Sequence, residues 1–207
     1  MATIVYIDGF NLYYGAVKDT KYKWLDLVAL CDRLLPKEEI TKIRYFTARV
    51  VARPKDPQQP VRQETYLRAL ATFPQIEIHF GHFSEHRLRL PLANPTRGTP
   101  NTVEVLKTEE KGSDVNLATY LLRDAFRNEC ATAVVVSNDS DLAEPVRVLR
   151  TETDVRVGII NPHPERYRSR ELRGTFFKQL RRSTLHSCQL PETLQDDNGT
   201  IRKPAGW

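Results

Sequence analysis

Cysteine is scarce in this sequence. The chain of 207 residues has three: Cys31, Cys130 and Cys188. They are far apart and odd in number, so they form neither a disulfide framework nor the close pairs typical of a zinc site. Such sparse cysteine usage is typical of a reducing compartment, and we therefore expect a cytoplasmic protein.

The sequence also lacks a long apolar run. No stretch approaches the length that a helix needs to cross a bilayer, so we expect no membrane association. The chain opens directly into an apolar, strand-like segment, and we expect no signal peptide.

Charge of one sign is not in large excess either. There are 31 basic and 26 acidic residues, a net charge of +5 with a pI near 9.1. This mild excess permits an anionic partner such as a nucleic acid but does not require one. The five histidines show no zinc-binding spacing, and no Ser-His-Asp pattern is visible.

What the chain does have is an alternation of strands and helices. Apolar β-favouring runs predict strands at residues 4–8, 40–52, 76–80, 131–136 and 155–160. Helical spacing predicts helices at residues 24–35, 61–73, 112–129, 142–151 and 172–180. This alternation predicts an α/β domain of three layers, with a central parallel sheet and helices on both faces.

One segment departs from that rhythm. Residues 84–106 are rich in proline and arginine and are predicted to form an insertion, as a hairpin or loop beside the main sheet. We assign residues 1–182 to a single domain and residues 183–207 to a polar C-terminal extension, draped over the body or mobile.

The first strand ends in a carboxylate. Asp8 follows a buried apolar run, and Gly9 and Asn11 come directly after it. In open α/β sheets ligands bind at the carboxyl ends of the strands, so Asp8 and Asn11 are predicted to face a ligand crevice. An Asx turn with a helix cap is the structural alternative for these two residues.

Two later segments bring acids to the same edge. Asp114 begins a helix and shares its face with Leu117, Leu121 and other apolar residues. Asp139 and Asp141 follow the buried strand at residues 131–136. Each acid alone could be a helix cap, although one helix needs only one cap.

Together these carboxylates predict a metal site. Asp8, Asp114, Asp139 and Asp141 would repel one another when ionised, and a divalent cation removes that conflict. Carboxylate oxygens and water are the ligands that Mg²⁺ or Mn²⁺ prefers, and one or two such ions can polarise a phosphodiester and activate water.

Three motifs carry a resemblance to a known family. The stretches IVYIDGFNLYYG, KGSDVNLATYLL and VVVSNDSDLAEPVRVL resemble, in that order, the NYN domain, a branch of the PIN-like nuclease superfamily. The resemblance runs from about residue 2 to about residue 189. It implies a parallel sheet, a Mg²⁺ or Mn²⁺ site at its edge and cleavage of RNA, with the family's acidic and amide positions occupied here by Asp8, Asn11, Asp114, Asp139 and Asp141.

The chain departs from the family pattern at two places. Many relatives carry another acid where this chain has Tyr120, and Asp124, one turn further, is not expected to reach the edge. Asn138 replaces a glycine that is common in the turn. These departures keep a second reading open, in which the module binds RNA or regulates without catalysis.

Basic and polar residues near the acids predict where RNA would lie. Lys111 precedes a helix N-terminus, where a phosphate is favoured. Nearby tyrosines could stack bases, which favours single-stranded RNA. The residues assigned to RNA binding are Lys111, Ser137, Asn138, Ser140, Arg166, Arg168 and Arg170.

Other chemistries fit less well. A haloacid dehalogenase-type phosphatase needs an acid two residues after Asp8, where this chain has Phe10. The glycines do not make a dinucleotide-binding fingerprint. DNA cleavage, the identity of the RNA, the number of metal ions and assembly into a homo-oligomer stay open at this point.

Overall fold

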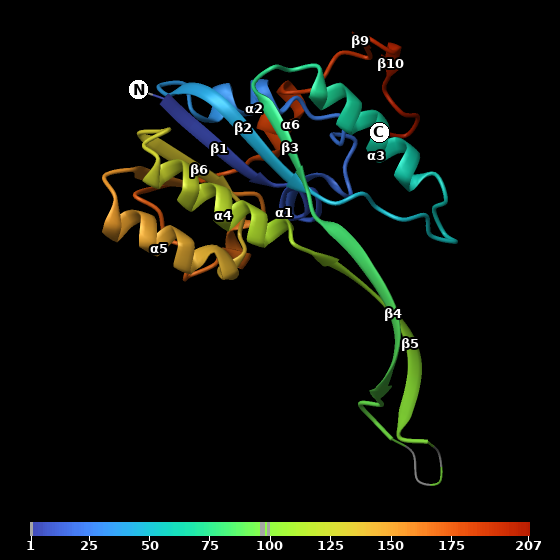
Figure 1. Cartoon of the computed structure of the whole chain (residues 1–207). Coiled ribbons are helices and arrows are strands. Elements are labelled where there is room, and N and C mark those ends of the chain that lie inside the picture. The colour runs from blue at the N-terminus through green and yellow to red at the C-terminus, as the bar shows by residue number, and fades with distance from the viewer. Residues whose placement is uncertain (1, 96–97, 99) are drawn as a thin grey trace.

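The centre of the molecule is a six-stranded sheet. The computed structural model describes residues 2–95, 98 and 100–207. The strands are parallel and follow the order β3-β2-β1-β6-β7-β8 (Figure 1). They comprise β1 (Ala2–Asp8), β2 (Glu39–Thr47), β3 (Ile76–Phe80), β6 (Thr132–Val136), β7 (Arg156–Asn161) and β8 (Phe176–Gln179).

Helices cover both faces of this sheet, which confirms the predicted three layers. Side chains alternate along β1, so Val5 and Ile7 enter one core cluster while Ile4 and Tyr6 enter the other. The first cluster lies under α2 (Leu27–Leu34) and α3 (Gln59–Ala71), and the second under α4 (Ser113–Phe126) and α5 (Ala143–Glu152). A short helix, α1 (Gly9–Leu12), continues into a π-helical turn at Tyr13–Val17.

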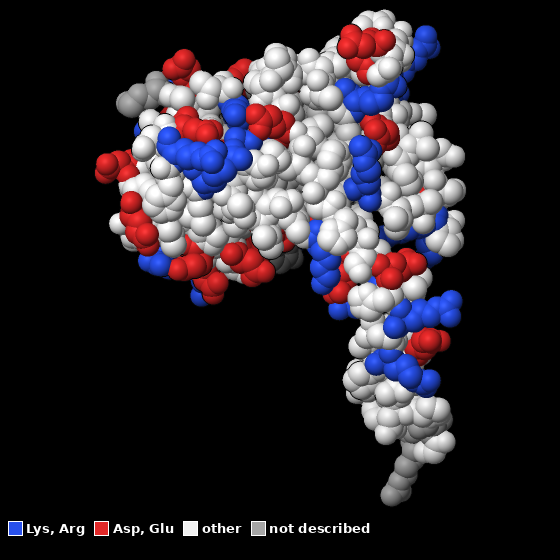
Figure 2. Space-filling model, viewed as in Figure 1, with Lys and Arg blue, Asp and Glu red and all other residues white. Residues whose placement is uncertain are grey.

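The predicted insertion is a long antiparallel hairpin. Strands β4 (His82–Pro91) and β5 (Thr102–Lys111) pair along their whole length and project away from the body (Figure 1). We call this hairpin the arm. Basic and acidic side chains are interspersed along it (Figure 2). Residues 96, 97 and 99, which belong to the predicted insertion, lie outside the described residues.

The prediction of a helix at residues 172–180 is wrong. That segment contains β8, which pairs in parallel with β7 and extends the sheet beyond the strand predicted to be its last. Phe176 packs against one core cluster and Phe177 against the other, which is the period of two that a strand imposes. The second predicted strand also ends earlier, at Thr47.

Residues 183–207 pack against the body. They contain most of α6 (Arg182–Ser187) and a hairpin of β9 (Thr193–Asp196) and β10 (Gly199–Arg202). Leu185, Leu190 and Ile201 are buried in the same cluster as α2 and α3. Arg68 of α3 also pairs with Asp196 at 2.8 Å.

All three cysteines are buried and free. None of the helices in the described part of the chain is both long and apolar enough to cross a membrane.

An ionic network lies between the sheet and α4. Asp124 is fully buried and accepts hydrogen bonds from Tyr6 Oη (2.9 Å), Arg44 Nε (2.6 Å) and Arg123 (2.7 Å). Burial alone would raise the pKa of Asp124, but the bonds from Arg44 and Arg123 lower it overall. The ring of Tyr120 lies under both guanidinium groups. Asp124 therefore serves the core, and the prediction that it does not reach the sheet edge is confirmed.

Removing the charge of Asp124 should destabilise the fold strongly. In Asp124→Asn, the buried Arg44 loses its fully buried charged partner and keeps only the partly exposed Glu77 and Glu129, and breaking a buried pair costs about 3–5 kcal/mol. The free energy of unfolding, measured by urea titration, reports this loss. The control is Glu64→Gln, which breaks the exposed pair with Arg49 and should cost no more than about 1 kcal/mol. Equal losses in the two variants would contradict a structural role for Asp124.

Candidate metal centre

Asp8 is held rigidly at the end of β1. It is only 5% exposed, and its two carboxylate oxygens accept hydrogen bonds from the backbone N–H of Asn11 (2.8 Å) and from Ser137 Oγ (3.0 Å). The chain then turns through Gly9, where a Cβ atom would lie 2.7 Å from the carbonyl oxygen of Phe46 and 2.8 Å from the ring of Tyr45. A glycine is required there because the backbone of α1 passes so close to β2.

Asp114 reaches the same edge from the start of α4. Gly112 precedes the helix with a φ of +92°, a left-handed conformation that glycine adopts without strain. Glu110, at the end of the arm, accepts hydrogen bonds from the backbone N–H (3.1 Å) and Oγ (2.8 Å) of Ser113. The base of the arm thus fixes the first turn of α4 and with it the half-buried Asp114.

Asp139 is held by the turn that follows β6. Its backbone N–H donates to Ser137 Oγ at 3.1 Å, and its Oδ1 accepts a hydrogen bond from the N–H of Asp141 at 3.0 Å. Ser137 thus connects the two acids, since it donates to Asp8 and accepts from Asp139.

The three carboxylates converge. Asp8, Asp114 and Asp139 each offer one oxygen, and these oxygens lie within 4.8 Å of one another. They line a cleft of about 390 Å³. Two ligands on opposite sides of an octahedral Mg²⁺ ion are about 4.2 Å apart, since each lies about 2.1 Å from the ion. The oxygen-only donor set therefore suits a hard divalent cation, and oxygens up to 4.8 Å apart need only a small inward shift to reach that separation.

Electrostatics also favour a cation at this point. Burial, with the nearby charges of Asp114 and Asp139, raises the pKa of Asp8 to about 7 despite the two hydrogen bonds that it accepts. Burial together with Asp139, Glu110 and Asp141 raises the pKa of Asp114 to about 6. A bound divalent cation would offset this repulsion and keep the carboxylates ionised.

Asn11 and Asn138 connect the loops around the centre. Asn11 Oδ1 accepts a hydrogen bond from the backbone N–H of Asn138 at 2.9 Å. Asn138 in turn donates from Nδ2 to the carbonyl of Tyr167 (2.8 Å) and accepts at Oδ1 from the N–H of Ser169 (2.8 Å). Its amide is therefore used to hold the segment after β7, while Asn11 lines the cleft.

The other predicted site residues are not among the three converging carboxylates. Asp141 is exposed and outside the carboxylate group, though near enough to raise the pKa of Asp114. Ser137 is fully buried behind Asp8, whereas Ser140 is exposed.

The predicted basic residues do not line the cleft. The guanidinium of Arg168 lies over the ring of Phe177 at 3.5 Å, and Arg166 lies over Tyr167 at 4.7 Å. Lys111 pairs with Glu109 at 3.3 Å. Arg170 is exposed.

Three residues that the sequence reasoning missed do line the cleft: Arg53, Glu110 and His163. Arg53 comes from the proline-rich loop before α3, which carries no periodic signal. Glu110 stands three residues before Ser113, at the start of α4. An acid just ahead of a helix start can accept hydrogen bonds from its first turn, and this pattern was visible in the sequence.

Comparisons with known proteins agree with this architecture. The family model of the NYN domain matches residues 2–177. The chain also resembles a crystal structure of a protein of unknown function from Vibrio parahaemolyticus, with a TM-score of 0.55 and 15% sequence identity, over 97% of this chain and 96% of that one. At this identity the second likeness speaks for the fold alone.

One relative is named as a monooxygenase. The protein called 6-hydroxy-3-succinoylpyridine 3-monooxygenase HspA, from Pseudomonas putida, is 32% identical over an alignment of 237 residues. The alignment covers all of this chain and 75% of the relative.

The raised pKa values predict how stability depends on pH. In the metal-free protein, Asp8 and Asp114 release protons between about pH 5 and pH 8, where the unfolded chain has already released them, so the free energy of unfolding falls as pH rises. Thermal unfolding in EDTA should show this fall, and Mn²⁺ should oppose it. The slope should be shallower in Asp8→Asn. A midpoint that rises with pH in EDTA would contradict the assignment.

Proposed function

This chain belongs to the NYN domain family, and on that premise we propose that it is a metal-dependent endoribonuclease that hydrolyses phosphodiester bonds of RNA. The observation that carries the proposal is the convergence of Asp8, Asp114 and Asp139, whose oxygens lie within 4.8 Å of one another in an open cleft. The three come from β1, α4 and the loop after β6. The fold places strand ends and helix starts together at that edge.

Mg²⁺ or Mn²⁺ is the cofactor that the donor set suits best. When bound, such an ion supplies Lewis-acid polarisation of the phosphodiester and lowers the pKa of water. Asp8, Asp114 and Asp139 hold it, and Asp141 lies at the rim. Hydrogen bonds of Asn11 and Ser137 join the segment after β1 to the segment after β6. The carboxylates would therefore need little reorganisation when the ion and the substrate bind.

The surroundings of the cleft suit a single strand of RNA. Arg53 lines the cleft and offers a guanidinium to a phosphate. Tyr14 and Tyr167 are 52% and 59% exposed, so their rings are available to stack on unpaired bases. Arg166, Arg168 and Arg170 would extend the contact along the strand, beyond the cleft. The buried free cysteines fit the proposed cytoplasmic location.

A second candidate function comes from the relative at 32% identity. Its name describes hydroxylation of a substituted pyridine, and a shared fold does not fix the reaction. The donor set here favours hydrolysis, because non-haem iron oxygenases typically hold their metal with two histidines and one carboxylate. In this cleft His163 is the histidine among the described lining residues.

The nuclease proposal predicts metal-dependent cleavage of single-stranded RNA. Purified protein should cut such RNA with Mn²⁺ and stop when EDTA is added. Asp8→Asn and Asp139→Asn should each reduce the rate by about 100-fold or more, because the ion contributes several kcal/mol of transition-state stabilisation. Electrophoresis of end-labelled RNA measures the rate.

The matched control is Asp197→Asn, an exposed acid in the β9–β10 turn, which should retain full activity. Activity that persists equally in Asp8→Asn and Asp139→Asn would overturn the proposal. Binding of RNA without turnover, even at high Mn²⁺, would favour a non-catalytic RNA-binding module. Faster cleavage of a matched DNA strand would reassign the substrate.

The oxygenase candidate has a direct test. Protein incubated with 6-hydroxy-3-succinoylpyridine, oxygen and a reductant should leave the pyridine unchanged, as followed by chromatography. Conversion that depends on protein and on the reductant would instead favour the relative's reaction. The same preparation is assayed on RNA, so an inactive sample is recognised.

A further inference from the structure

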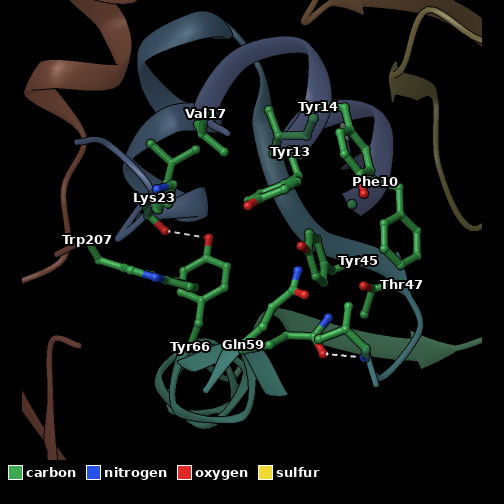
Figure 3. A pocket seen from close by; sticks show the side chains of 15 residues that line it. Phe10, Tyr13, Tyr14, Val17, Lys23, Tyr45, Thr47, Gln59, Tyr66 and Trp207 are labelled. Atoms are coloured by element: carbon green, nitrogen blue, oxygen red, sulfur yellow. Dashed lines mark hydrogen bonds between the residues drawn. The ribbon is translucent and has the colours of Figure 1, made fainter. Parts of the chain in front are cut away.

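A second cavity opens beside the acidic cleft. It measures about 80 Å³ and lies between α1, β2, α3 and the last residue of the chain (Figure 3). We call it the aromatic pocket, because its walls include Tyr13, Tyr45, Tyr66 and Trp207. The reaction proposed above makes no use of it.

The walls of the aromatic pocket are held in place without a ligand. Tyr66 donates a hydrogen bond from its hydroxyl to the carbonyl of Leu25 at 2.8 Å. Trp207 packs against Tyr66 with ring centroids 5.8 Å apart and against Trp24 at 6.5 Å. Tyr45 is 8% exposed. Because these rings are already ordered, a ring-shaped ligand would lose little binding energy to ordering them.

One wall of the pocket carries an uncommitted amide. Both ends of the Gln63 amide already form hydrogen bonds: its Oε1 accepts from the N–H of Val50 (2.8 Å), and its Nε2 donates to the carbonyl of Ala48 (2.9 Å). Gln59 lies one turn earlier on α3, and no described residue bonds its side chain. Figure 3 shows this side chain among the aromatic rings. A free amide presents a donor and an acceptor side by side, as the edge of a nucleobase does.

The aromatic pocket and the acidic cleft adjoin each other. Four residues line both: Phe10, Tyr14, Val50 and Gln59. A molecule that places a neutral ring in the pocket can therefore extend a phosphate into the cleft, beside Asp8 and Asp114.

We propose that the aromatic pocket binds the base of one pyrimidine nucleotide in the strand whose phosphate occupies the cleft. The inference rests on the proposed nuclease function and adds a base preference to it. Aromatic walls stack on a planar ring, and the Gln59 amide reads its polar edge. The pocket, at about 80 Å³, is smaller than the ~150 Å³ apolar cavity that takes up benzene in another protein, so it has no room for the fused rings of a purine and would take a single ring only in part, with its polar edge toward Gln59.

Nuclear magnetic resonance tests the pocket without requiring catalysis. The chain has two tryptophans, so its spectrum contains two indole N–H signals, and Trp207→Phe identifies one of them. Titration with uridine monophosphate should shift the Trp207 signal and the side-chain amide of Gln59. Ribose 5-phosphate, which lacks the base, should leave both in place, and adenosine monophosphate should bind more weakly.

Gln58 provides the matched control. Gln59→Leu should weaken binding of uridine monophosphate at least about fivefold, whereas Gln58→Leu changes an exposed glutamine at the start of the same helix and should have no effect. Tyr13→Leu, which removes a stacking wall, should weaken binding as well. No shift of the Trp207 signal, an equal shift with ribose 5-phosphate, or unchanged binding in both Gln59→Leu and Tyr13→Leu would each overturn the proposal.

Cleavage mapping separates the base-pocket proposal from the nuclease proposal on which it rests. On RNA of mixed sequence with Mn²⁺, cuts should cluster at a fixed distance from pyrimidines, and Gln59→Leu should remove the clustering. Cutting without base preference would overturn the base pocket and leave the nuclease standing. Binding of uridine monophosphate with no cleavage of any RNA would overturn the nuclease function and leave a ring-binding site.

Discussion

The repulsion between three carboxylates held close together is the constraint on which the rest of the structure depends. Asp8, Asp114 and Asp139 come from segments more than a hundred residues apart at the extremes. Hydrogen bonds fix Asp8 and Asp139, and the bonds between Glu110 and Ser113 fix the helix turn that carries Asp114. Burial and mutual charge raise the pKa values of Asp8 and Asp114 instead of lowering them. The fold thus keeps together, at a cost in stability, a group of acids that could bind a divalent cation.

The core supports this arrangement from behind. The central strand β1 carries Tyr6 toward α4 and ends in Asp8, so one strand supplies both a core contact and one of the three converging carboxylates. Asp124, almost three turns beyond Asp114 on α4, is bound by Arg44 and Arg123 within the core. The buried ionic network thus fixes the far part of the helix whose first turn presents Asp114.

Local sequence patterns predicted the parts of the site that strand and helix ends determine. Asp8, Asp114 and Asp139 follow from the rule that carboxyl ends of parallel strands meet at one edge, and apolar runs located β1 and β6. The rest depends on contacts between distant segments. Phe176 and Phe177 fit a short helix as well as a strand until β7 offers its edge, and nothing near Trp207 in sequence indicates that it packs on Tyr66.

The arm couples the centre to events far from it. Each strand has ten residues, so the ribbon reaches about 34 Å from the body. Its root is anchored to α1 by the Phe10–Phe83 contact, with centroids 5.7 Å apart, and it runs directly into the turn that carries Asp114. The hairpin and the turn that carries Asp114 are therefore joined twice, by the continuous backbone and by the hydrogen bonds between Glu110 and Ser113.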